Sequence, residues 1–222
     1  MNNGTLPKQF MELDGKPILI YTLENFEKHP AIKGIILVCL ESYIPLAKQL
    51  INKFHITKIM DVISGGSTGQ ESIRNGLFKL NELVSDDAVV LVHDGVRPLI
   101  NEQIIFKAIE CVNKKGNAIT TSPAIETIIH KDQDGDIEQI IERARCELAR
   151  APQCFKLRDL IWAHKQAIAD GNMEFIDSAC LMTHYGFKLH TVVGPSENIK
   201  ITTPVDFYLF KAFKEAQAAG EN

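Results

Sequence analysis

The sequence lacks the features that mark secreted, membrane-spanning and zinc-binding proteins. Its five cysteines are scattered, odd in number and without a C-x-x-C pair, which argues against a disulfide framework and a zinc site and favours a reducing compartment. No apolar run approaches the roughly 20 residues of a membrane span, and no signal peptide precedes the first polar residues. We therefore expect a cytoplasmic protein that does not enter a membrane.

An excess of basic residues is also lacking. The chain has 24 lysines and arginines against 28 aspartates and glutamates, a formal net charge of -4. This balance predicts no nucleic-acid partner, so basic residues that bind an anionic ligand must be gathered locally. A G-x-G-x-x-G motif after a strand is missing as well, which disfavours a dinucleotide-dependent oxidoreductase.

What is present is enough chain for one core. The sequence has 222 residues, of which 45% are hydrophobic, and this suits a single large α/β domain over residues 1–222 better than two small ones. Repeats, linkers and low-complexity segments are not found in it.

Hydrophobic patterning predicts strands and helices that alternate. We expect strands at 34–40, 57–63, 88–91, 117–123 and 188–193, and helices at 17–29, 42–54, 73–84, 101–114, 157–169, 177–183 and from 204 onward. This order is typical of a mostly parallel sheet with helices packed on it.

The pattern changes between residues 126 and 151. Two short apolar runs, 127–130 and 137–141, flank a polar turn with Asp134-Gly135, which predicts a β-hairpin. A hairpin that leaves a parallel sheet must bury its apolar face. We expect this arm to form a homodimer with a partner subunit.

One polar stretch follows the apolar strand 88–91 directly, and it reads Val92-His93-Asp94-Gly95-Val96-Arg97-Pro98. Buried parallel strands deliver polar side chains from their carboxyl ends into the ligand crevice. A carboxylate at Asp94 can hold a divalent cation, and Arg97 can bind phosphate or pair with a carboxylate. The alternative is an ordinary surface Asp-Gly turn.

A second stretch precedes the helix 73–84, and it reads Ser64-Gly65-Gly66-Ser67-Thr68-Gly69-Gln70-Glu71-Ser72. Glycines let a ligand approach the backbone, and free amides and hydroxyls at a helix start bind nucleotides. The alternative is a capped loop without a ligand.

Five motifs in this order resemble the IspD/TarI family of cytidylyltransferases. They are Leu6-Pro7-Lys8-Gln9-Phe10, the loop from Gly65-Gly66 to Ser72, Val92 to Pro98, Pro152-Gln153 before Phe155, and Asn198-Ile199-Lys200-Ile201-Thr202. The resemblance covers almost all of the chain. It implies a Rossmann-like doubly wound, mostly parallel sheet with helices on both faces and a protruding β-hairpin dimerisation arm. It also implies transfer of CMP from CTP to a polyol phosphate.

The resemblance implies roles for individual residues. Lys8 and Lys200 match catalytic lysines on the phosphates, and Asp94 matches the catalytic carboxylate that holds Mg²⁺. The nucleotide-binding set comprises Gly65, Gly66, Ser67, Ser72 and Arg97, although the family often has an acidic residue where Ser67 stands. The polyol-phosphate-binding set comprises Thr127, Arg143 and Asp177, with Arg143 donated by the hairpin region of the partner subunit.

Several positions depart from the family pattern. Ala151 and Ile176 stand where threonines near the polyol are common, which removes two hydroxyl contacts. Arg145 and Arg150 have no counterpart that we can assign, and we expect them at the surface. The family begins with a strand and a glycine-rich loop, of which Met1-Asn2-Asn3-Gly4 resembles only the end. We therefore expect an upstream extension in the natural product.

These observations leave three functional hypotheses. The first is a CTP-dependent cytidylyltransferase acting on ribitol 5-phosphate, favoured by Phe10-Met11-Glu12-Leu13, Val96 and Thr202-Thr203. The second is a methylerythritol 4-phosphate cytidylyltransferase of isoprenoid biosynthesis. The third is a non-catalytic nucleotide-binding protein that retains the crevice without turnover.

Overall fold

The structure, a computed structural model, describes residues 6–220. In the first half strands and helices alternate, as β1 (Glu12–Leu13), β2 (Lys16–Pro17), α1 (Ile18–Lys28), β3 (Ile35–Cys39), α2 (Ile44–Lys53), β4 (Ile59–Ser64), α3 (Gly69–Leu83), β5 (Val89–Val92) and α4 (Glu102–Lys115). The second half contains β6 (Asn117–Pro123), β7 (Ile128–Lys131), β8 (Ile137–Ile141), β9 (Glu147–Lys156), α5 (Leu157–Ala169), α6 (Ser178–His184), β10 (Thr191–Val193) and α7 (Pro204–Ala219). The predicted α/β class is confirmed. Residues Met1–Gly4, compared above with the end of a glycine-rich loop, lie outside the described residues.

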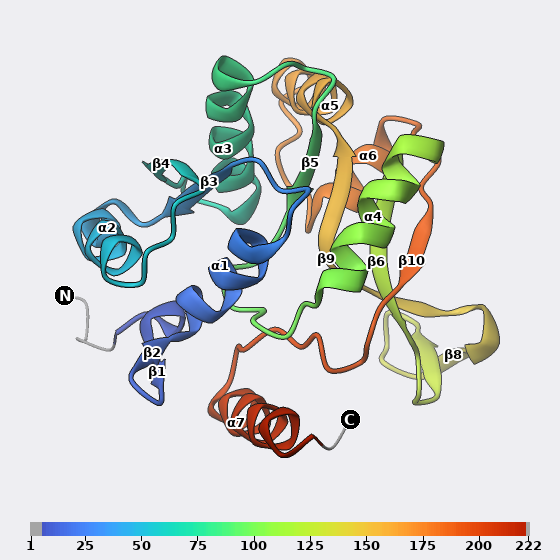
Figure 1. Ribbon diagram of the computed structural model, residues 1–222. Coiled ribbons are helices and arrows are strands. Elements are labelled where there is room, and N and C mark those ends of the chain that lie inside the picture. Colours follow the sequence, from blue (N-terminus) through green and yellow to red (C-terminus); the bar gives the residue numbers. More distant parts are fainter. Residues whose placement is uncertain (1–5, 221–222) are drawn as a thin grey trace.

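The strands form more than the single sheet that we expected. A four-stranded sheet has the order β10-β6-β9-β5, and β3 pairs in parallel with β4 in a separate sheet (Figure 1). No strand within residues 6–220 bonds to both β3 and β5, and this keeps the two sheets apart. In the larger sheet β10 runs parallel to β6, whereas β9 runs antiparallel to β6 and β5.

Helices cover both faces of the four-stranded sheet, as predicted. Alternate strand residues point to opposite faces. Ala118 and Cys154 pack with α4 residues, whereas their sequence neighbours Ile119 and Phe155 pack with α5 residues. The sheet is therefore buried between helices, and its strand ends carry the loops considered below.

Strand β9 was not predicted. Its sequence mixes charged residues with Pro152 and Gln153, and this hides the apolar alternation of a strand. The strand forms because it fills the place between β5 and β6, where it pairs with both. Its second half is buried by this packing.

The predicted hairpin is present as β7 and β8. Ile128 lies opposite Ile141, and Gly135 adopts a φ of 94° in the connecting turn. In Figure 1 the hairpin lies at the lower right, beyond the ends of β6 and β9. Its role as a dimerisation arm stays a prediction.

Helix α7 closes the chain against the first strands. Its buried Phe210 packs with Leu13, Ile18, Leu99 and Ile201. Thr203 caps the helix and forms a capping box with Asp206. Within the described residues, no helix combines the length and the apolarity that crossing a bilayer requires.

Candidate functional site

The loop after β5 brings Asp94 together with two cations. Arg97 donates from Nε to Asp94 Oδ2 at 2.8 Å, and Lys200 donates from Nζ to Asp94 Oδ1 at 2.9 Å. Burial by itself would raise the pKa of the Asp94 carboxyl, but the hydrogen bonds and charges of Lys200 and Arg97 outweigh it and lower that pKa. Asp94 is therefore ionised at neutral pH. The cluster joins two of the predicted motifs.

Arg97 is held inside the loop. Its side chain is buried, with 8% of the residue exposed, and Nη1 donates to the carbonyl of Asn198 at 2.9 Å. Asn198 is itself fully buried and donates from Nδ2 to the carbonyl of Ala151 at 2.7 Å. Arg97 thereby orders the loop, and its predicted nucleotide contact stays a prediction.

Helix α1 supports the same loop. Thr22 Oγ1 donates to the carbonyl of Gly95 at 3.0 Å, and Asn25 Nδ2 donates to the carbonyl of Pro98 at 3.0 Å. His93 lies beneath the loop with Nε2 3.1 Å from the Arg97 carbonyl oxygen. Burial lowers the pKa of His93 to about 4, so the ring is neutral at physiological pH. These contacts fix the backbone that carries Asp94.

The glycine-rich stretch forms a tight loop between β4 and α3. The amide of Gly66 donates to Ser72 Oγ at 3.0 Å, and both the amide and the hydroxyl of Ser67 donate to the Glu71 carboxylate, at 2.7 and 2.6 Å. A Cβ on Gly66 would lie 2.0 Å from Cγ of Glu71. The structure thus brings together the four predicted nucleotide-binding residues of this loop, Gly65, Gly66, Ser67 and Ser72.

Glu71 organises this loop, and our sequence reasoning missed it. The hydrogen bonds from Ser67 are the largest cause of the lowered pKa of the Glu71 carboxyl, and Arg74 adds an ion pair at 3.1 Å. Thr68 is the N-cap of α3, so Thr68 and Glu71 have the spacing of a capping box. That spacing was the signal that could have identified Glu71.

Lys8 is not a member of the hydrogen-bonded cluster of Asp94, Arg97 and Lys200. It begins a short 3-10 helix, Lys8–Phe10, whose Phe10 is buried and stacks on Tyr43 at 5.3 Å between ring centroids. The Lys8 side chain is exposed, and among residues 6–220 Lys200 and Arg97, not Lys8, bond Asp94. Its predicted contact with the triphosphate is not tested by the fold.

The predicted polyol-phosphate residues belong to the β6–β9 side of the molecule. Asp177 accepts from Gln153 Nε2 at 2.8 Å and caps α6 through the Cys180 amide, also at 2.8 Å. Arg143 donates to the Ile125 carbonyl at 2.8 Å, and Thr127 is exposed just before β7. Within residues 6–220, no hydrogen bond or ion pair joins this set to Asp94.

Asp94 could supply one carboxylate ligand to a metal ion. Within residues 6–220, no three His, Cys, Asp or Glu side chains are grouped to hold a metal ion. Mg²⁺ is commonly bound by one or two carboxylates together with water and substrate phosphates. The ionised Asp94 fits that kind of site.

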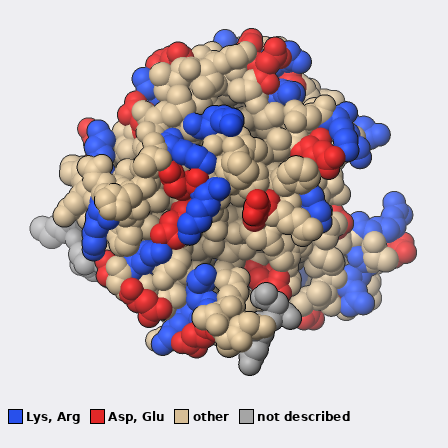
Figure 2. Space-filling model, in the orientation of Figure 1, with Lys and Arg blue, Asp and Glu red and all other residues tan. Residues whose placement is uncertain are grey.

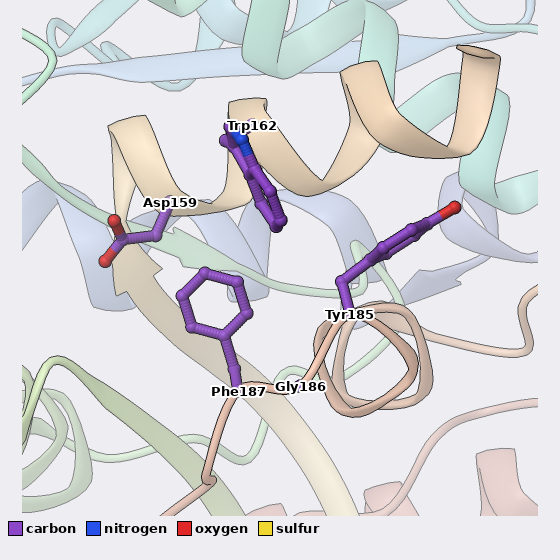
Figure 3. A pocket seen from close by; sticks show the side chains of 5 residues that line it. All are labelled: Asp159, Trp162, Tyr185, Gly186 and Phe187. Carbon is purple, nitrogen blue, oxygen red and sulfur yellow. The ribbon is translucent and has the colours of Figure 1, made fainter. Parts of the chain in front are cut away.

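Other surface features do not include the predicted residues. A hollow of about 260 Å³ is lined by Asp159, Trp162, Tyr185, Gly186 and Phe187. Figure 3 shows how these residues lie around it. On the face drawn in Figure 2, basic and acidic side chains are interspersed. That face therefore presents no continuous basic surface.

Comparison with known proteins identifies the family of this chain. The family model described as "IspD: 2-C-methyl-D-erythritol 4-phosphate cytidylyltransferase" matches residues 1–215. A ribitol-5-phosphate cytidylyltransferase of Vibrio parahaemolyticus is 50% identical over 98% of this chain and 91% of its own length. A 2-C-methyl-D-erythritol 4-phosphate cytidylyltransferase of Syntrophus aciditrophicus is 37% identical over 93% of this chain and 87% of its own length.

Solved structures share the fold. The 4-diphosphocytidyl-2C-methyl-D-erythritol synthase of Anaerococcus prevotii superposes with a TM-score of 0.83 at 26% identity, covering 92% of this chain and 88% of that one. The family match extends over both the loop that carries Gly66 and the cluster at Asp94, so the predicted resemblance is confirmed. The chain belongs to the IspD family of cytidylyltransferases.

Proposed function

We propose that this protein transfers CMP from CTP to ribitol 5-phosphate and releases pyrophosphate. The observation that carries the proposal is the cluster of Asp94, Arg97 and Lys200, in a chain 50% identical to a ribitol-5-phosphate cytidylyltransferase. The five cysteines are free thiols, which suits a reducing compartment. A cytoplasmic location is therefore part of the proposal.

The reaction joins two anions, so it depends on positive charge and positioning. A phosphate oxygen of the acceptor attacks the α-phosphorus of CTP, the bond from that phosphorus to the β-phosphate bridging oxygen breaks, and pyrophosphate leaves. The attacking group is already ionised and needs no strong base. Lys8 and Lys200 would neutralise charge that develops on the phosphates, while Arg97 holds the Asp94 loop in place.

Asp94 would hold Mg²⁺, with the phosphates of CTP and water as its remaining ligands. The bound ion would add positive charge beside the phosphates. Support for this assignment comes from the lowered pKa of Asp94, which keeps its carboxylate ionised despite burial. Lys200 and Arg97 each bond one oxygen of that carboxylate, so its orientation is determined before a ligand arrives.

The loop from Gly65 to Ser72 would bind the nucleoside. A Cβ on Gly66 would overlap the Glu71 side chain and one on Gly65 would crowd Ser72 Oγ, so this tight loop requires glycine at both positions. Ser67 and Ser72 would then contact the base or the ribose after exchanging a hydrogen bond within the loop. Ser67 would give up the hydrogen bond from its hydroxyl to Glu71, and Ser72 the one from its hydroxyl to the Thr68 carbonyl.

The acceptor would lie between Asp177 and the hairpin arm of a second subunit. Thr127 and Arg143 would bind its phosphate, with Arg143 presented by one subunit to the site of the other. The hairpin region exposes four isoleucines, Ile125 at 74%, Ile129 at 40%, Ile137 at 61% and Ile140 at 67%. Such a surface is favourable only when it is covered, and a homodimer would cover it.

A second candidate acceptor is 2-C-methyl-D-erythritol 4-phosphate. It is favoured by the description of the family model and by the relative that is 37% identical. Ala151 is buried and Ile176 is 94% exposed. Neither side chain has a hydroxyl group, so these positions would contribute no such contact to either acceptor. The higher identity of the ribitol-5-phosphate relative places it first.

Pyrophosphate release tests the proposal. The protein is incubated with CTP and Mg²⁺, and ribitol 5-phosphate, methylerythritol 4-phosphate or neither is added. We expect turnover with a higher kcat/KM for ribitol 5-phosphate than for methylerythritol 4-phosphate. The reverse preference would assign the second acceptor, and turnover with neither would support a nucleotide-binding protein without catalysis.

A further inference from the structure

Arg150 is a cation near the proposed site, and it has no anionic partner among residues 6–220. We predicted a surface position for it, but the structure places it half-buried in β9. Its Nε donates to Ser122 Oγ at 3.1 Å, and no carboxylate of residues 6–220 lies within ion-pair distance of it. Because a guanidinium has five donor hydrogens, the ends of this side chain have unused bonding capacity.

The surroundings of Arg150 are already positive. Burial, and then the charge of Arg97, lower the pKa of Arg150. Arg97 and Lys200 share the carboxylate of Asp94, so that acid is not available to Arg150. Removing an arginine from water beside another arginine is unfavourable unless an anion binds there.

Hydrogen bonds connect Arg150 to the proposed catalytic loop. Arg97 bonds the carbonyl of Asn198, and Asn198 bonds the carbonyl of Ala151, the residue after Arg150. Ser122, the partner of Arg150, is 1% exposed and lies near the end of β6. Arg150 is thus fixed in position from two sides.

The position of Arg150 favours the acceptor over the nucleotide. Its strand also carries Gln153, which bonds Asp177, whereas Arg143 is proposed to reach the site from the partner subunit. The loop proposed for the nucleoside belongs instead to β4 and α3, in the region of the other sheet. Asp177, a proposed polyol-phosphate residue of the same subunit, is therefore tied to the strand that carries Arg150.

We infer that Arg150 is a substrate-binding residue that binds the phosphate of the acceptor. This inference rests on the proposed function and deepens it. Arginine suits the role because its planar fork bonds two phosphate oxygens at once. An uncharged residue at position 150 would leave the acceptor with fewer charge-assisted bonds.

Two variants of the full chain test this inference. Arg150→Gln keeps a donor for Ser122 without the charge, and Arg150→Lys keeps the charge without the fork. The matched control is Arg158→Gln, because Arg158 is an exposed arginine at the start of α5 that pairs with Asp87. Calorimetric titration measures the binding of ribitol 5-phosphate, inorganic phosphate and CTP with Mg²⁺ to each protein.

We expect the Kd for ribitol 5-phosphate to rise on the order of 10- to 100-fold in Arg150→Gln, the effect of losing a charged hydrogen bond. Arg150→Lys should recover part of this loss, and affinity for CTP should not change. Unchanged acceptor binding in Arg150→Gln would overturn the inference, and so would a loss confined to CTP. Wild-type protein that binds neither ribitol 5-phosphate nor inorganic phosphate would overturn it too.

The same proteins separate this inference from the proposed function. Pyrophosphate release by the wild-type protein tests the reaction, whereas acceptor binding by the variants tests Arg150. A wild-type protein that binds ribitol 5-phosphate through Arg150 without turnover would contradict the reaction alone. Turnover that does not depend on Arg150 would contradict the inference alone.

Discussion

At the scale of single residues, Asp94 is the charged group of the proposed site whose burial must be offset by bonds to other charges. It is partly buried, ionised and bonded by two cations, Arg97 of the same loop and Lys200 from a distant part of the chain. A partly buried carboxylate is stable when its oxygens are bonded in this way. A third cation, Mg²⁺, could join the cluster together with the added negative charge of CTP.

Replacing Asp94 should abolish most of the activity. We expect Asp94→Asn to lower kcat on the order of 10²- to 10³-fold, because a neutral amide neither holds Mg²⁺ well nor balances Lys200 and Arg97. Pyrophosphate release over a range of Mg²⁺ concentrations measures the effect. Asp87→Asn, at an exposed carboxylate that pairs with one arginine, is the matched control. Full magnesium-dependent activity in Asp94→Asn would refute the assignment.

Asp94 was singled out by its position along the chain, and its role in the site stays a prediction. Asp94 follows a buried strand, and such residues are directed toward a crevice. The contact between Asp94 and Lys200 joins residues 106 positions apart, and spacing along the chain cannot reveal it. That Arg150 pairs with no carboxylate of residues 6–220 was equally invisible in the sequence, because it depends on where the acidic side chains lie in the fold.

At the scale of elements, the loop between β4 and α3 depends on two glycines. Gly66→Ala should disturb it, because the new Cβ would overlap the Glu71 side chain that holds Ser67. We expect kcat/KM for CTP to fall on the order of 10- to 100-fold through misplacement of the loop. Steady-state kinetics with varied CTP measure this change.

Gly69→Ala provides the matched control for that loop. Gly69 begins α3, and a Cβ there would meet nothing within 4 Å. The substitution should leave kinetics with CTP unchanged. Equal kinetics for the two alanine variants would show that the tight packing at Gly66 has no functional consequence.

The start of α7 should confer a pH-dependent stability. Backbone amides of Thr202 and Thr203, aided by their hydroxyls, hold the pKa of Asp206 at about 2, below its ordinary 3.8. A depressed pKa stabilises the folded protein above the unfolded value and loses that effect as pH falls through the folded value. The contribution of Asp206 is therefore complete above pH 3.8 and declines toward about pH 2.

Asp206→Asn measures this contribution. An acid in the first turn of a helix is worth about 0.3–1 kcal/mol, so the variant should unfold more easily in urea at neutral pH. The difference in the free energy of unfolding between wild type and variant should shrink as the solution is acidified below pH 3.8. A difference that stays constant with pH would contradict the prediction.

Prediction of elements was accurate where local patterning is strong. Helices α1, α4 and α5 begin and end within a residue or two of their expected limits, since each has an apolar face of helical period. Strand β9 escaped notice because tertiary pairing, rather than its own pattern, makes it a strand.

At the scale of the whole molecule, the proposed site draws on both sheets. The loop of Gly65 and Gly66 follows β4, Asp94 follows β5, and the acceptor residues surround β6 and β9. The proposed reaction needs CTP and acceptor at one place, and β5 lies at the edge of the larger sheet. Asp94 is therefore suitably placed to contact both substrates.

We predict that the hairpin forms a dimer interface and that one charged substitution in it disrupts the dimer. Ile140→Glu should convert the dimer into monomers, because burying a carboxylate at an apolar interface is costly. Activity should fall with it, since Arg143 would no longer reach the second subunit. Analytical ultracentrifugation and pyrophosphate release measure the two effects.

The matched control for the hairpin is Ile168→Glu. Ile168 is 47% exposed on α5, away from the hairpin. This variant should remain dimeric and active. A wild-type protein that sediments as a monomer, or an Ile140→Glu variant that stays dimeric, would contradict the proposed arm.

The sequence by itself determined the α/β class, the family, the hairpin and the motifs that follow the strands, because these depend on local periodicity and short polar stretches. Only the tertiary structure decided that β9 inserts between β5 and β6, that Lys200 reaches Asp94, and that Arg150 is half-buried with no carboxylate partner among residues 6–220. The physical reason is that pairing, burial and charge balance are set by residues far apart in the chain, which come together only when the core is packed.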